Sequence, residues 1–91
     1  MFESSRIDVS GIETNVVAID FGASNTDAAA ILNGKLRVWN EWRRGMPSVE
    51  SIHDILRAGG LRLSDVSLLA VTGGHHQILP DEIDGVPLLK V

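Results

Sequence analysis

The stretch 16–27 constrains the fold of this chain most, because a short β-branched run ends there in an aspartate and continues into a bend of small and hydroxylated residues. The run 16–19 has the length and composition of a strand. Asp20 then lies where the strand leaves the sheet, so its carboxylate can reach a hydrated cation. The pattern predicts a site for phosphate and metal. Its alternative is a plain strand and turn, in which the aspartate only stabilises the turn.

The bend itself is built from residues that suit a phosphate group. Glycine and alanine carry no bulky side chain, so a phosphate can approach the backbone there. Hydroxyl and amide side chains can donate hydrogen bonds to phosphate oxygens. Five consecutive residues are therefore candidates for binding nucleotide phosphates. They are Gly22, Ala23, Ser24, Asn25 and Thr26.

Length and composition limit the class of protein. A chain of 91 residues is enough for one small domain, and 44% hydrophobic with 22% charged residues indicates a globular one. The net charge of -4 disfavours nucleic-acid and anionic-membrane partners, and the lack of cysteine excludes disulfides and thiolate metal sites. No apolar run approaches the roughly 18 residues that span a bilayer, and the first residues lack a signal-peptide core. We expect a soluble, cytoplasmic protein.

An Asn-Gly pair predicts how the chain continues after the bend. Asn33 and Gly34 lie between the apolar runs 28–32 and 35–39, which is a strong hairpin signal because both turn residues need positive φ. Three consecutive antiparallel strands result. The rival interpretation is a helix over 26–34, which its alanines favour. That helix would have about two turns, which is short for a crossover connection, so we favour the hairpin.

The next segment predicts a helix over 47–58. Pro47 and Ser48 supply a start signal, and Gly59 with Gly60 ends the helix. Its apolar residues recur at helical spacing on one face. They are Val49, Ile52, Ile55 and Leu56.

A buried strand is predicted at 66–71, apolar on both faces toward its end as in a parallel sheet. A helix between two such strands implies a right-handed crossover. The strand stops at Thr72, Gly73 and Gly74, and the carboxyl ends of parallel strands are where α/β sheets bind ligands. These three residues are candidates for a substrate cleft, with an ordinary turn as the alternative.

Other polar clusters are assigned no chemistry. We expect Trp39 and Trp42 to cover the sheet or a helix end, and Arg43 and Arg44 to be solvated. Metal binding by the adjacent histidines His75 and His76 is disfavoured, because neighbouring side chains in a strand point apart and no third ligand is visible.

Four further segments complete the chain. The lead-in 1–15 is mixed and polar. A short helix is expected to begin at Ile78 and Leu79, and the acidic stretch 81–85 is expected to be an exposed loop. An extended segment is expected over 86–91. Because it is apolar and no polar tail follows, the sequence is expected to be truncated there.

The predicted order of elements resembles a known fold. Three antiparallel strands, a crossover helix and a parallel strand (α/β, order β-β-β-α-β, mixed sheet) resemble the opening of the ribonuclease-H-like fold of the actin, sugar kinase and heat-shock ATPase superfamily. The run 20–24 is similar to the D-x-G-x-[ST] phosphate motif in the first hairpin of that superfamily. The block 69–74, followed by Ile78, Ile83, Pro87 and the terminal apolar run, resembles type II pantothenate kinases. The resemblance covers roughly residues 16–91.

The resemblance implies a function. Residues 16–91 would be the first part of an N-terminal ribonuclease-H-like ATPase domain, in an ATP-dependent kinase that phosphorylates pantothenate in coenzyme A synthesis. It implies Mg²⁺ and a homodimer. Asp20 would be the catalytic carboxylate that holds hydrated Mg²⁺, residues 22–26 would cradle the ATP phosphates, and residues 72–74 would shape the cleft for the acceptor.

The chain departs from the family pattern in its phosphate motif. Asp27 stands where the family has a lysine, and Ala23 stands where it has a second glycine. The family's catalytic glutamate is expected just beyond Val91, so we expect this N-terminal fragment to be inactive alone. Two alternatives are another ATPase of the superfamily, of the activator, hydantoinase or acyltransferase-like type, and a non-catalytic module whose open sheet mediates assembly.

Overall fold

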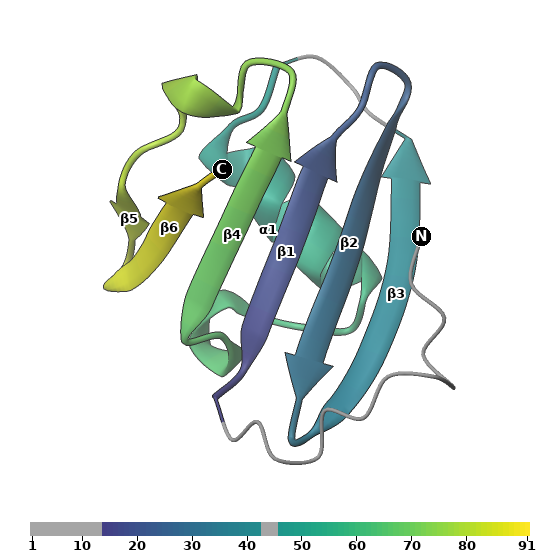
Figure 1. The fold of residues 1–91 in the computed structure, drawn as a ribbon, viewed down its shortest axis with the longest axis vertical. Coiled ribbons are helices and arrows are strands. Elements are labelled where there is room, and N and C mark those ends of the chain that lie inside the picture. The colour runs from purple at the N-terminus through teal and green to yellow at the C-terminus, as the bar shows by residue number, and fades with distance from the viewer. Residues whose placement is uncertain (1–13, 43–45) are drawn as a thin grey trace.

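A computed structural model of the protein describes residues 14–42 and 46–91, and these residues form a mixed six-stranded sheet with a helix against one face (Figure 1). The strands follow the order β3-β2-β1-β4-β6-β5 across the sheet. The elements along the chain are β1 (Val16–Phe21), β2 (Asn25–Leu32), β3 (Lys35–Trp42), α1 (Val49–Ala58), the 3-10 helix η2 (Leu63–Asp65), β4 (Leu68–Gly73), the 3-10 helix η3 (His76–Ile78), β5 (Glu82–Ile83) and β6 (Val86–Lys90).

The first three strands form the predicted antiparallel meander. β1 pairs with β2, and β2 pairs with β3, each in antiparallel register. Asn33 and Gly34 join β2 to β3 with φ of 52° and 76°, which are the positive angles that a two-residue hairpin turn requires. The prediction of a hairpin is confirmed, and the alternative helix over 26–34 is wrong.

Helix α1 begins with a reciprocal cap. The Ser48 side chain accepts from the backbone N–H of Ser51, and the Ser51 side chain accepts from the backbone N–H of Ser48. The helix therefore begins at Val49, two residues later than predicted. Ile52, Ile55 and Leu56 are buried as expected, whereas Val49 is 39% exposed because the first turn lies outside the contact with the sheet.

The connection from β3 through α1 to β4 crosses the sheet in the predicted right-handed sense. In Figure 1 α1 lies behind the sheet and runs from behind β4 down toward β2, and β3, β1 and β4 all point upward. β4 lies parallel to β1, starts at Leu68 rather than at position 66, and ends at Gly73. The predicted order β-β-β-α-β is present, with η2 inserted before β4.

The segment after β4 differs from the prediction in two places. The expected helix at 78–79 is instead η3, which ends at Ile78. The acidic stretch 81–85 is not only a loop, because it contains β5, which pairs with β6 around Asp84 and Gly85. Both turn residues have positive φ (49° and 84°), so Asp-Gly acts here as Asn-Gly does between β2 and β3. The extended segment expected over 86–91 is present as β6.

Side-chain alternation gives the sheet a buried and an open face. Beneath α1 lie the large buried side chains of the central strands, including Val17, Ile19, Phe21, Leu69 and Val71. The opposite face, toward the viewer in Figure 1, carries no helix among the described residues. Its centre is a cross-strand row of three alanines, with Val38 on β3 and Leu89 on β6 at its two ends. The alanines are Ala29, Ala18 and Ala70.

Asn15, the residue before β1, ties three segments together. Its side-chain amide donates to the carbonyl of Asp65 at 2.9 Å, and its side-chain oxygen accepts from the N–H of Asn33 at 3.1 Å. Its carbonyl accepts from the N–H of Ser67 at 2.9 Å. Of the predicted lead-in 1–15, residues 1–13 lie outside the described residues.

The two tryptophans of β3 have different environments. Trp39 covers the end of α1 as predicted, because its Nε1 donates to the carbonyl of Ile55 at 2.8 Å and its ring lies against Gly59. Trp42 is 74% exposed and covers nothing comparable. The expectation for Arg43 and Arg44 falls outside the described residues. No helix in 14–42 or 46–91 is long and apolar enough to cross a membrane.

The contact between Trp39 and Gly59 predicts a size limit at the end of α1. A Cβ at Gly59 would overlap the indole ring of Trp39. We expect Gly59→Ala to lower the free energy of unfolding by about 1–3 kcal/mol, as for other overpacked sites, measured by urea denaturation followed by circular dichroism. In a Trp39→Leu background the same substitution should cost far less. An equal cost in both backgrounds would contradict the proposed overlap.

Candidate phosphate and metal site

The bend between β1 and β2 leaves backbone N–H groups open to solvent. Gly22 donates its N–H to the carbonyl of Asn25 at 2.9 Å, which closes the bend. A Cβ at Gly22 would lie 2.8 Å from that carbonyl oxygen, so the closure requires glycine. Ala23 and Ser24 are exposed, and within the described residues no hydrogen bond occupies their backbone N–H groups. The bend can therefore offer two adjacent donors to an anion.

The turn at the end of β4 lies directly against the end of β1. Gly74 donates its N–H to the carbonyl of Phe21 at 2.9 Å. Gly73 has a φ of +98°, and a Cβ there would lie 2.5 Å from the Phe21 carbonyl oxygen and 2.7 Å from Oδ1 of Asp20. The structure thus brings together the predicted carboxylate, the bend and the 72–74 turn, although they are about fifty positions apart in the sequence.

His76 is a positioning residue that the sequence reasoning missed. It is buried, and its Nδ1 lies 2.7 Å from the carbonyl oxygen of Gly73. A carbonyl oxygen only accepts, so Nδ1 carries the proton and donates. His76 thereby holds the glycine turn beside Asp20. No group of three or more histidine, cysteine, aspartate or glutamate side chains that could hold a metal occurs within the described residues.

A row of polar side chains crosses the open face at this end of the sheet. Asp20 pairs with Asp27 on β2 and with Thr72 on β4, and Asp27 pairs with Asn40 on β3. These four residues line one hollow of about 640 Å³ over the alanine row. Among the described residues, its lining contains two side-chain carboxylates and no lysine or arginine. Thr72 is already engaged, because its hydroxyl donates to the carbonyl of Val91 at 3.2 Å.

The five predicted phosphate-binding residues do not share one face. Thr26 is buried, and strand alternation directs its side chain toward α1, on the opposite side of the sheet from Asp20. It lines a second hollow of about 420 Å³ between α1 and the strands. The hydroxyl of Thr26 therefore cannot reach a ligand held by Asp20, and the candidate set narrows to Gly22, Ala23, Ser24 and Asn25.

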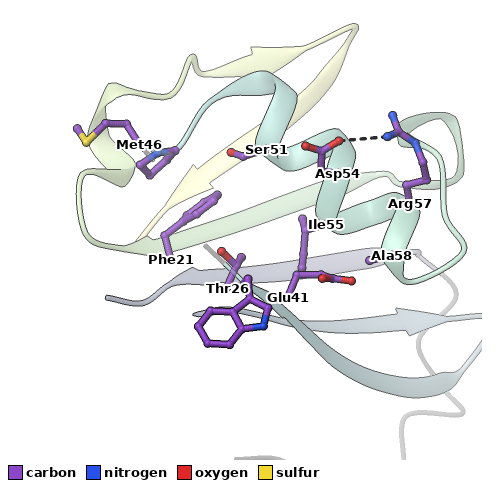
Figure 2. A pocket seen from close by; sticks show the side chains of 11 residues that line it. Phe21, Thr26, Glu41, Met46, Ser51, Asp54, Ile55, Arg57 and Ala58 are labelled. Carbon is purple, nitrogen blue, oxygen red and sulfur yellow. Dashed lines mark hydrogen bonds and ion pairs between the residues drawn. The ribbon is translucent and has the colours of Figure 1, made fainter. Parts of the chain in front are cut away.

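Figure 2 shows this second hollow, with Thr26 and Glu41 on the strands below and Ser51 and Asp54 on the helix above. Asp54 forms an ion pair with Arg57 at 3.1 Å, and both side chains are at least 70% exposed. Exposed pairs of this kind contribute little stability. Because the sheet separates this hollow from the carboxylates of the open face, it adds nothing to the site at Asp20.

The fold and site define an α/β domain with a mixed sheet and a candidate anion-binding bend. Comparisons with protein-family models, curated proteins and solved structures gave no significant match. The class of site therefore depends on the geometry alone. Exposed backbone donors beside a strand-end carboxylate can bind a phosphate group together with its cation.

The close approach of the β4 turn to β1 yields a test with a matched control. Gly73→Ala places a Cβ against Asp20 and Phe21 and also strains the positive φ, so we expect a loss of about 2 kcal/mol or more in the free energy of unfolding. Gly85→Ala strains a similar φ of +84° but meets nothing within 4 Å, so it should cost about 1 kcal/mol. Equal costs in denaturant titrations would show that the contact contributes nothing.

Proposed function

We propose that this chain forms the first part of an ATP-dependent small-molecule kinase of the actin, sugar kinase and heat-shock ATPase superfamily. The strand order supports this proposal, because β2 runs against β1, β3, β4 and β6 in one sheet with a crossover helix between β3 and β4. That arrangement agrees with the opening of a ribonuclease-H-like domain. The run 20–24 resembles the phosphate motif that this superfamily carries in its first hairpin.

The observation that carries the proposal is the juxtaposition of three features at the end of β1. The exposed amides of Ala23 and Ser24 supply donors, and Asp20 supplies a carboxylate. Gly73 lets the 72–74 turn pack directly against that carboxylate, where any side chain would collide with it. Phosphoryl transfer depends mainly on positioning and charge stabilisation, so backbone donors and a metal-holding carboxylate are its main requirements.

The donor set also fits Mg²⁺. This ion binds through one or two carboxylates, substrate phosphates and several waters rather than through a full protein cage. Asp20 would hold it through water, with Asp27 directly opposite on β2. The two carboxylates repel a phosphate group unless a cation lies between the carboxylates and the phosphate, because no basic side chain of residues 14–42 or 46–91 lines the hollow. Binding of ATP is therefore expected to require the metal.

The acceptor in this proposal is pantothenate or a similar small molecule, taken from the resemblance of the 69–74 block to type II pantothenate kinases. Thr72, Gly73 and Gly74 would shape its cleft. The homodimer and the cytoplasmic location belong to the same proposal.

A titration of ¹⁵N-labelled protein tests the binding step. MgATP should shift the amide signals of Ala23, Ser24 and Gly74, and chelation of Mg²⁺ by EDTA should reverse the shifts. Asp20→Asn should weaken binding about tenfold, because it removes a charge that holds the cation.

Asp54→Asn is the matched control for that titration, since it removes an exposed carboxylate on the other face of the sheet. It should leave the affinity unchanged. Shifts confined to residues around Asp54, or binding that ignores EDTA, would contradict the proposed site.

Catalysis is a separate question from binding. We expect the 91-residue chain alone to show no kinase turnover, because the resemblance locates the catalytic glutamate and the second ATP-binding domain elsewhere. A coupled assay of ADP release, with pantothenate as acceptor, measures this. Turnover well above that of the Asp20→Asn variant would show that the chain is a complete catalyst.

A non-catalytic assembly role is the second candidate. It is favoured by one observation, the long edge strand β3, which pairs only with β2 among the described residues.

A further inference from the structure

The two edges of the sheet are protected unequally. At one edge, β5 has only two residues, and Pro87 on the neighbouring strand is opposite one of them. At the other edge, β3 has eight residues without a proline or glycine. Short strands and prolines prevent pairing between chains, whereas a long open strand invites it. β3 is therefore the edge available to a partner.

The hairpin register fixes which backbone groups of β3 point outward. Leu32 and Lys35 flank the two-residue turn and form its closing hydrogen-bonded pair, and such pairs alternate along an antiparallel ladder. The odd-numbered residues of β3 therefore bond to β2. The even-numbered residues present their N–H and C=O groups to the outside. They are Leu36, Val38, Asn40 and Trp42.

We propose that β3 pairs antiparallel with β3 of a second copy of this chain, centred on Val38. Two identical edge strands pair antiparallel about a twofold axis perpendicular to the sheet, which keeps α1 of both copies on one side. Outward-facing residues then pair only with outward-facing residues. Centring on Val38 pairs Leu36 with Asn40 and Val38 with itself, which gives about six backbone hydrogen bonds.

Charge selects this register among those that symmetry allows. Centred on Val38, Lys35 of each copy lies opposite Glu41 of the other, so two oppositely charged pairs form. Centring on Arg37 would place the two arginines opposite each other. Centring on Trp39 would pair Arg37 with Glu41, but the Arg37 guanidinium already donates to the carbonyl of Gly59 and the Trp39 ring is held under α1.

The exposed indole of Trp42 agrees with the same register. Pairing centred on Val38 places Trp42 opposite Gly34 of the second copy, a position without a side chain. The ring can lie over that glycine and against Leu36, which is half-buried in the single chain. The interface thus covers the most exposed tryptophan in the described part of the chain. The proposed kinase is also expected to be a homodimer, but this interface does not involve the phosphate-binding bend, so loss of the dimer and loss of MgATP binding are separate outcomes.

Sedimentation equilibrium of the full chain over a concentration series tests the interface. We expect the mass to rise from one chain to two. Lys35→Glu and Glu41→Lys should each weaken dimerisation at least tenfold, because each converts two attractive pairs into two repulsive ones.

A mixture of these two variants gives the sharpest result. Every 35–41 pair in the mixed dimer is attractive again, so the mixture should form a dimer where each variant alone stays monomeric. The double variant should also regain wild-type dimerisation. Weakening by Glu41→Lys without any effect of Lys35→Glu would overturn the register centred on Val38.

Val38→Pro tests the backbone contribution. It removes an outward N–H that β2 does not use, so β3 should keep its place while the dimer is lost. Circular dichroism confirms folding, and Val38→Thr, which keeps the N–H, serves as the control. A folded Val38→Pro variant that still dimerises, or a wild-type chain that remains monomeric up to about 1 mM, would refute the proposal.

Discussion

The parallel pairing of β1 with β4 is the interaction on which the other parts of the structure depend. β1 carries the β2–β3 meander on one side, and β4 carries β6 on the other, so this pair joins the two halves of the sheet. Under α1 their alternating side chains supply much of the buried core. At its end the pairing becomes very close, since Gly73 meets the backbone of Phe21. The same contact that completes the sheet positions the bend and the carboxylate.

Local signals in the sequence predicted most of the local structure. The β-branched run at 16–19, the Asn33-Gly34 turn and the apolar spacing in α1 each act over a few residues, so they could be interpreted without coordinates. Asp84-Gly85 carries the same turn chemistry, but its acidic neighbours suggested a loop. His76 could not be found this way, because its role is a contact with a carbonyl that only the path of the turn creates.

The site was predicted only in part, because the residues of a sequence motif are consecutive whereas consecutive residues of a strand point to opposite faces of the sheet. The bend ends at Asn25, where β2 begins, and from there alternation sends Thr26 toward α1 and Asp27 to the side of Asp20. The kinase family that the chain resembles has a lysine at the position of Asp27. The aspartate found there reverses the local charge, so any phosphate bound at the bend depends on a cation for its neutralisation.

Both tryptophans of the chain lie on β3, and their surroundings differ: Trp39 donates to a helix carbonyl, and Trp42 is 74% exposed. Intrinsic fluorescence therefore reports on the edge strand rather than on the centre of the sheet. The two emission components separate by environment, since a water-soluble quencher such as iodide reaches Trp42 far more easily than Trp39. One spectrum thus contains an internal comparison between a covered and an exposed indole on the same strand.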